Sequence, residues 1–252
     1  MSPPHSRPEG TRTKIATKSA PQARHTRPIP IVALDFPRAD VALKMVERLG
    51  DVCKFYKVGG ELFTAAGPQV VQALRALGND VFLDLKLHDI PNTVRGAARS
   101  AAEIGAKLLT VHATGGREMI AAAVEGAGTR CGVLGVTILT SLDAAMLRSA
   151  WGRKTLEVYG EVLRLAGDCA DEGAHGVVCS GQEASKISAK YGDKLKLLVP
   201  GIRVAGGKVD DQKRAVTAAE AAKAGANYIV LGRMITEAKD PRSELQAVMR
   251  SI

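Results

Sequence analysis

The sequence predicts a single α/β domain of the (β/α)8 type, a TIM barrel, behind a disordered basic N-terminal extension. Eight apolar runs of strand length recur after residue 28, and Ala- and Leu-rich segments with helical periodicity separate them. The runs are nearly continuous, as expected for parallel strands covered on both faces. Such repeats within about 220 residues fit one barrel, and no linker divides residues 29–252, the expected catalytic domain.

The order of the elements follows the same repeat throughout. The first helix is expected to open with Asp40 as its N-cap and to close at Gly50, and the next begins at Pro68 and stops at Gly78. A doubly wound open sheet is the alternative, but it usually has a glycine-rich loop after its first strand, and "ALDFPRAD" contains no G-x-G. The strands are expected at residues 29–36, 52–59, 80–87, 107–114, 132–140, 175–180, 195–202 and 227–233.

Residues 1–28 differ in composition from the rest of the chain. They are rich in Pro, Ser, Thr and Arg, and they hold six Lys and Arg against Glu9 alone. They therefore supply 5 of the 9 net positive charges, which leaves the barrel only mildly basic. Such a segment cannot bury enough apolar surface to order itself, so we expect a disordered extension. An organelle address or an interaction arm is the alternative, and a nucleic-acid role would rest on this segment alone; we expect none.

The cysteines and the hydropathy indicate a cytoplasmic location. No C-x-x-C pair occurs, and a chain of this size does not need disulfides, so the four cysteines are expected to be free buried thiols in a reducing compartment. No apolar run of about 18 residues is present, so no membrane span is expected. The cysteines are Cys53, Cys131, Cys169 and Cys179.

Charged and polar residues gather at the ends of the expected strands. In barrels of this type the active site lies at the carboxyl ends of the strands. A scaffold alone does not need charges there, so these positions are the candidate site. They are Asp35, Lys57, Asp84 and Lys86 with Asp89 beyond them, His112, Thr140, Ser141, Arg203, Gly232 and Arg233.

The third strand end carries the densest charge. Asp84 and Lys86 are two residues apart, so strand alternation points both toward the barrel mouth. Lys57 comes from the neighbouring strand and Asp89 lies past the strand end. Alternating opposite charges within several ångströms hold each other ionised. The alternative is a purely structural ion-pair network, but such networks cost desolvation and seldom improve on apolar packing.

The last two strands indicate a phosphate site. Arg203 precedes a glycine-rich loop and Arg233 follows Gly232. Barrels often bind phosphate at the loops after strands 7 and 8, and arginine recognises its oxygens bidentately. A solvated loop cation is the alternative reading of either arginine. His88 and His112 show no metal-ligand spacing, so we expect packing or supporting roles for them, and no metal or cofactor.

Together these motifs carry a family resemblance. Residues 83–93, "LDLKLHDIPNT", contain D-x-K-x-x-D-I-P-N-T, and "ALD", "KVG", "LTS", "PGIR" with a following "DQ", and "LGR" occur in the matching order. From residue 29 to about residue 250 the sequence resembles the orotidine 5′-monophosphate (OMP) decarboxylases. The resemblance implies a cofactor-free, metal-free carboxy-lyase that forms UMP in the last step of de novo pyrimidine synthesis.

The resemblance also implies roles for single residues. Lys86 would protonate C6, Asp84 would sit beside the substrate carboxylate, and Asp35 and Lys57 would bind the ribose. Asp89, Ile90 and Thr93 would reach into the partner's site in a homodimer. The pyrimidine would meet Pro200 and either Thr140 or Ser141, and the phosphate would meet Arg203, Gln212, the backbone of Gly232 and the side chain of Arg233. The loop 203–212, with glycines at 206 and 207, would close over the site.

Two other functions are compatible with the sequence. Sugar-phosphate decarboxylases and synthases of the same superfamily share D-x-K-x-x-D but use Mg²⁺, and Glu61 leaves room for an acidic metal ligand after the second strand. "IPNT" and the "GIR…DQ" pair favour the nucleotide enzyme. The other rival is a nucleotide-binding barrel without catalysis, against which the presence of both Asp84 and Lys86 argues.

Overall fold

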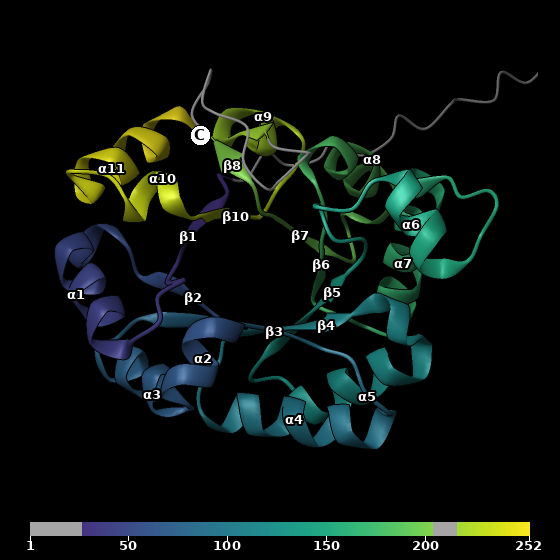
Figure 1. The fold of residues 1–252 in the computed structure, drawn as a ribbon, viewed down its shortest axis with the longest axis horizontal. Coiled ribbons are helices and arrows are strands. Elements are labelled where there is room, and N and C mark those ends of the chain that lie inside the picture. Colours follow the sequence, from purple (N-terminus) through teal and green to yellow (C-terminus); the bar gives the residue numbers. More distant parts are fainter. Residues whose placement is uncertain (1–26, 204–215) are drawn as a thin grey trace, which may run out of the picture.

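A computed structural model of the protein describes residues 27–203 and 216–252, and its centre is a closed barrel of parallel strands. Figure 1 looks along the barrel, with the first strand beside the last. The strands run around it in the order β1, β10, β7, β6, β5, β4, β3, β2. The predicted (β/α)8 barrel is therefore confirmed. The bounds are β1 Ile29–Ala33, β2 Phe55–Gly59, β3 Asp80–Leu87, β4 Leu108–His112, β5 Gly132–Val136, β6 Gly176–Val178, β7 Lys196–Val199 and β10 Tyr228–Leu231.

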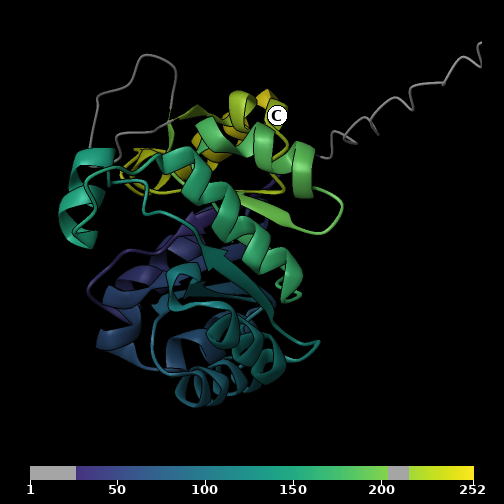
Figure 2. The same cartoon turned by 90° about the vertical axis from the view of Figure 1, so that its right-hand side faces the viewer.

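Helices surround the strands as an outer layer (Figure 1). Figure 2 looks onto the side that α7 and α8 cover. Short extra helices precede or follow the main one in three of the connections, at α2, α6 and α10. The bounds are α1 Ala39–Leu49, α2 Gly60–Ala66, α3 Gln69–Ala76, α4 Pro91–Glu103, α5 Arg117–Ala127, α6 Ala144–Trp151, α7 Val158–Asp171, α8 Gly181–Tyr191, α9 Ala218–Lys223, α10 Arg233–Thr236 and α11 Pro241–Ser251, with single 3-10 turns at Gly50–Val52 and Ala113–Gly115.

Several strands end earlier than predicted. The strand predicted at 132–140 ends at Val136, and the one predicted at 195–202 ends at Val199. Beyond that point Ile202–Arg203 forms β8, which pairs with β9 (Val216–Thr217) outside the barrel. The apolar pattern continued past the strands because residues such as Ile138 stay buried in the loops that line the barrel mouth.

The predicted N-cap of the first helix was also wrong. The helix begins at Ala39 and its N-cap is Arg38, without a side-chain capping bond. Asp40 lies in the first turn and instead pairs with the guanidinium of Arg38. The predicted ends are confirmed at Gly50, which has a φ of 58°, and at Gly78, with a φ of 75°. A side chain would be strained at either φ, so glycine at these positions ends the helix.

Most of the expected extension, residues 1–26, lies outside the described residues. Its last two residues contact the barrel domain. Pro28 is buried, and the Arg27 side chain donates hydrogen bonds to the carbonyl oxygens of Ile252 (2.8 Å) and Met249 (2.5 Å) at the end of α11. The chain therefore enters the barrel beside its own C-terminus.

Two apolar layers hold the barrel together. The larger layer fills the space between the strands and the outer helices. The smaller layer fills the inside of the barrel with one residue from each strand other than β6, and with two from β1. Because several of these side chains also face the cavity at the barrel mouth, this inner layer forms the floor of that cavity. Its members are Ile31, Ala33, Phe55, Phe82, Leu108, Leu134, Leu198 and Val230.

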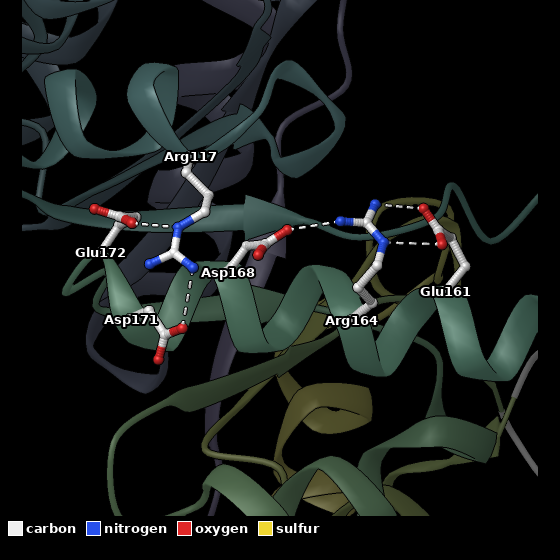
Figure 3. Close-up of polar contacts among 6 residues, drawn as sticks. All are labelled: Arg117, Glu161, Arg164, Asp168, Asp171 and Glu172. Atoms are coloured by element: carbon white, nitrogen blue, oxygen red, sulfur yellow. Dashed lines mark hydrogen bonds and ion pairs between the residues drawn. The ribbon is translucent and has the colours of Figure 1, made fainter.

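A surface ion-pair cluster connects two of the outer helices (Figure 3). Arg117 at the start of α5 donates to Glu172 (2.6 Å) and to Asp171 (3.3 Å) at the end of α7. Arg164 joins Glu161 and Asp168 within α7. The side chains of Arg117 and Arg164 are each 55% exposed, so solvent screening keeps the contribution of these pairs small.

Candidate active site

A cavity of about 580 Å³ opens at the carboxyl ends of the barrel strands. Apolar side chains from β1, β3, β5, β6, β7 and β10 form its depth, and charged residues stand at its wall. The structure thus brings together most residues that the sequence singled out, as expected for a site built on parallel strand ends. Those in the wall are Asp35, Lys57, Asp84, Lys86, Thr140, Pro200, Arg203, Gly232 and Arg233.

Four of these residues form a continuous array of alternating charge. Lys57 Nζ lies 2.7 Å from Asp35 Oδ1 and 3.7 Å from Asp84 Oδ2, and Lys86 Nζ lies 2.8 Å from the same Asp84 oxygen. The inner side chains, Lys57 and Asp84, are only 11% and 13% exposed, whereas Lys86 is 38% exposed. Burial of the inner pair is tolerable because each charge has opposite neighbours. Lys86 is the more accessible of the two ammonium groups.

The backbone at Lys86 is irregular. Leu83 is opposite Leu109 and Leu87 is opposite Val111, so the three residues 84–86 of β3 face Thr110 alone. Lys86 has a φ of 50°, in the left-handed region that costs a non-glycine residue about 1–2 kcal/mol. The prediction that Asp84 and Lys86 face the same cavity is confirmed, but its reason was wrong. A β-bulge, not simple alternation, sets the direction of Lys86.

Thr110 on β4 is a site residue that the sequence reasoning missed. Its side chain is fully buried, and its hydroxyl accepts a hydrogen bond from the Lys86 N–H (2.9 Å) and donates one to Asp84 Oδ1 (2.9 Å). The available signal was a hydroxyl residue within the otherwise apolar run "LLTV", on the strand next to the charged one. A buried hydroxyl needs partners, and the neighbouring charged strand was the place to seek them.

Two histidines lie next to the array. The rings of His88 and His112 have centroids 5.3 Å apart. Burial lowers the pKa of His112 below its ordinary value, and the nearby His88 and Lys86 lower it further, against the opposing effect of Asp84. Across residues 27–203 and 216–252, no three His, Cys, Asp or Glu side chains are grouped so as to hold a metal ion.

A second part of the cavity lining is basic. Arg203 ends β8 and Arg233 begins α10, and both line the cavity together with Glu237. A Cβ built on Gly232 would meet nothing within 4 Å, so the space above its backbone is open. Two guanidinium groups beside exposed backbone suit an anionic group with several oxygens.

Some predicted site residues lie elsewhere. The described part of the cavity wall does not include Asp89, Ile90 or Thr93, which are exposed around the start of α4. Asp89 Oδ1 accepts a hydrogen bond from the Ile90 N–H (2.6 Å), and the Ile90 side chain is 67% exposed. Ser141 is exposed and only its neighbour Thr140 lines the cavity. Gln212 and residues 204–211 of the predicted closing loop lie outside the described residues.

Fold and cavity together define a (β/α)8-barrel protein in which a lysine–aspartate array and two arginines line one pocket. The family model "Orotidine 5'-phosphate decarboxylase / HUMPS family" matches residues 28–248. The chain belongs to this family.

Individual relatives agree with the family model. An orotidine 5′-phosphate decarboxylase of Anaeromyxobacter sp. (strain K) is 50% identical over 216 residues, covering 86% of this chain and 94% of the relative. One from Nitratidesulfovibrio vulgaris (strain DP4) is 46% identical over 227 residues, covering 87% and 95%. Among solved structures, orotidine 5′-phosphate decarboxylase from Lactobacillus acidophilus superposes with a TM-score of 0.79 at 38% identity, covering 90% of this chain and 99% of that one.

Proposed function

We propose that the protein decarboxylates orotidine 5′-monophosphate to UMP and CO₂, the last step of de novo UMP synthesis, with Lys86 as the proton donor. The activity follows from membership of the family and from relatives of that name at 46–50% identity. One observation carries the role of Lys86. Its ammonium lies in the cavity wall, 2.8 Å from Asp84, and its side chain is 38% exposed, so it is the accessible cation of the array, whereas the Lys57 side chain is only 11% exposed.

The reaction requires stabilisation of a carbanion. The bond between C6 and the carboxylate carbon breaks, its electron pair stays on C6, and CO₂ leaves. An N–H bond of the Lys86 ammonium then breaks as the C6–H bond forms, and the neutral amine regains a proton from water. A cation fixed where negative charge develops lowers the barrier without reorganisation, and the same group supplies the proton.

Asp84 would act on the departing carboxylate. Both of its oxygens are engaged, Oδ1 by the Thr110 hydroxyl and Oδ2 by the Lys86 ammonium, so the carboxylate is held in one orientation. A substrate carboxylate placed beside it would be repelled, and loss of neutral CO₂ would relieve that repulsion. Asp84 also keeps the Lys86 ammonium in place until the proton is transferred.

The rest of the nucleotide would supply binding energy. The phosphate would bind between Arg203 and Arg233, with the backbone of Gly232 and the Gln212 side chain, and the ribose would bind Asp35 and Lys57. Pro200 and Thr140 would contact the pyrimidine; Ser141 is the less suited neighbour because it is exposed and is not among the residues that line the cavity. Binding energy from the phosphate, remote from C6, would serve to orient the reacting carbon.

We further propose a cytoplasmic homodimer. Asp89, Ile90 and Thr93 are exposed at the start of α4, away from their own cavity, where they are free to complete the site of a second copy. An apolar side chain such as Ile90 at 67% exposure favours a covered surface there. In the described part of the chain, no helix has the length and apolar character needed to cross a membrane.

The test is the decay of orotate absorbance when the purified protein meets OMP in excess EDTA. We expect decay at an undiminished rate, because the proposed chemistry uses only side chains of the protein. Absence of decay with EDTA, together with turnover of a sugar phosphate after Mg²⁺ is restored, would instead place the chain among the metal-dependent members of its superfamily.

A further inference from the structure

Thr110, on the neighbouring strand β4, hydrogen-bonds to two members of the charged array, Asp84 and Lys86. It is fully buried between Leu109 and Val111, and the described part of the cavity wall does not include it. A hydroxyl in such a place is costly unless it is hydrogen-bonded. Both of its bonds, at 2.9 Å each, go to the array: one from the Lys86 N–H and one to Asp84 Oδ1.

The first bond supports the unusual backbone of Lys86. Because three residues of β3 oppose Thr110 alone, the regular pairing of the two strands is interrupted, and the Thr110 side chain takes the Lys86 N–H instead. A non-glycine residue keeps a left-handed φ such as the 50° of Lys86 only where its surroundings hold it. The Thr110 hydroxyl is one such holding contact.

The second bond orients the carboxylate that faces Lys86. With Oδ1 of Asp84 bound to the Thr110 hydroxyl, Oδ2 faces Lys86 Nζ at 2.8 Å and Lys57 Nζ at 3.7 Å. One hydroxyl thus fixes both the backbone of the lysine and the direction of its counter-ion.

We propose that Thr110 is a positioning residue for proton transfer to C6, acting through Lys86 and Asp84 without touching the substrate. The proposal rests on the proposed role of Lys86. Misplacement of a reacting group by about 1 Å costs on the order of 10²-fold in rate. Loss of the hydroxyl should therefore lower kcat far more than it alters KM, since the proposed phosphate contacts, Arg203 and Arg233, are not among the residues that Thr110 hydrogen-bonds.

The experiment compares three variants with the wild type. Thr110→Val removes the hydroxyl at nearly constant volume, and Thr110→Ser retains it. Thr137→Val is the matched control, because Thr137 is also a buried threonine (2% exposed) near the barrel mouth, but its hydroxyl donates to the Val178 carbonyl oxygen (3.0 Å) and not to the array. Each variant is checked for melting temperature and then assayed for kcat and KM with OMP.

A second readout isolates the proton transfer from the loss of CO₂. With UMP in D₂O, neutral Lys86 removes the C6 proton and returns a deuteron, so exchange followed by NMR measures the reverse of the proposed step. We expect Thr110→Val to lower both kcat and the exchange rate about 10²-fold with KM changed less than about fivefold. Thr110→Ser should recover most of both rates, and Thr137→Val should keep them. If Thr110→Val does not fold, Thr110→Ala provides the same comparison.

Three results would overturn the proposal: rates in Thr110→Val equal to those of Thr137→Val, a Thr110→Ser variant as slow as the valine variant, or a loss confined to KM. Failure of the proposed function is separate from these results, because it would appear as absent OMP turnover in the wild type.

Discussion

Removal of the Lys57 ammonium tests whether burial makes the array a stabilising unit. Lys57 is 11% exposed and lies between Asp35 (2.7 Å) and Asp84 (3.7 Å). At an effective dielectric constant of about 20, unit charges about 4 Å apart attract by about 4 kcal/mol. Breaking a buried pair by removing one partner costs about 3–5 kcal/mol, since the remaining charge stays buried without compensation. We expect Lys57→Met, which keeps the apolar stem, to lower the free energy of unfolding by about 3 kcal/mol.

The matched control removes the charge of Asp35, the exposed partner of Lys57. Asp35 is 57% exposed, so Asp35→Asn should cost only about 0–1 kcal/mol. Urea unfolding at constant m-value measures both changes, and repetition at higher salt should reduce the Asp35→Asn effect more, because exposed charges are screened more. Equal destabilisation by the two variants would refute the reasoning that burial of Lys57 and Asp84 makes their charges interdependent.

Three further predictions concern the barrel itself. Gly176→Ala should destabilise the protein by about 1–3 kcal/mol, because a Cβ there would lie 2.0 Å from the Lys196 carbonyl oxygen of the neighbouring strand. Arg117→Ala, which removes an exposed ion pair, should hardly change the melting temperature. Comparable changes of melting temperature in the two variants would show that the strand contact is not rigid. Burial raises the pKa of the Cys131 thiol to about 11 and that of Cys169 to about 12, so a thiol reagent at pH 8 should label neither until urea unfolds the chain; fast labelling of the native protein would contradict their burial. His112 has a pKa below its ordinary 6.5, so the unfolded chain binds more protons, and the free energy of unfolding should fall as the pH drops below about 6.5. His112→Gln should weaken that fall when denaturation curves at pH 7.5 and 5.5 are compared. An equal fall in the variant and the wild type would contradict the lowered pKa of His112.

The fold was predictable because its strongest signals are periodic. Continuous apolar strands and Ala-rich helices alternate regularly, and glycines such as Gly50 and Gly78 end helices where a positive φ is required. Strand ends were less predictable, because the barrel mouth also buries apolar loop residues such as Ile138. The N-cap of α1 was not predictable, because the helix begins one residue before Asp40, whose carboxylate pairs with the guanidinium of Arg38.

The site was predictable where a charge at a strand end stands out from an apolar run. Lys57, Asp84 and Lys86 were found in this way, and their pairing follows from the adjacency of β2 and β3. The bulge at Lys86 was not predictable from the sequence. A regular strand and a strand with two extra residues both place the Lys86 side chain on the same face, so the sequence pattern is the same in the two cases. Thr110 was missed because a lone threonine is common in strands, and its meaning depends on the register shift opposite it.

The most direct test of the account is Lys86→Ala assayed with OMP, with UMP affinity measured by calorimetry on the same sample. We expect turnover below detection, with UMP bound within a few-fold of the wild-type affinity, because the proposed phosphate and ribose contacts are made by residues other than Lys86. Near-normal turnover in this variant would contradict the assignment of Lys86 as the group that stabilises and protonates C6.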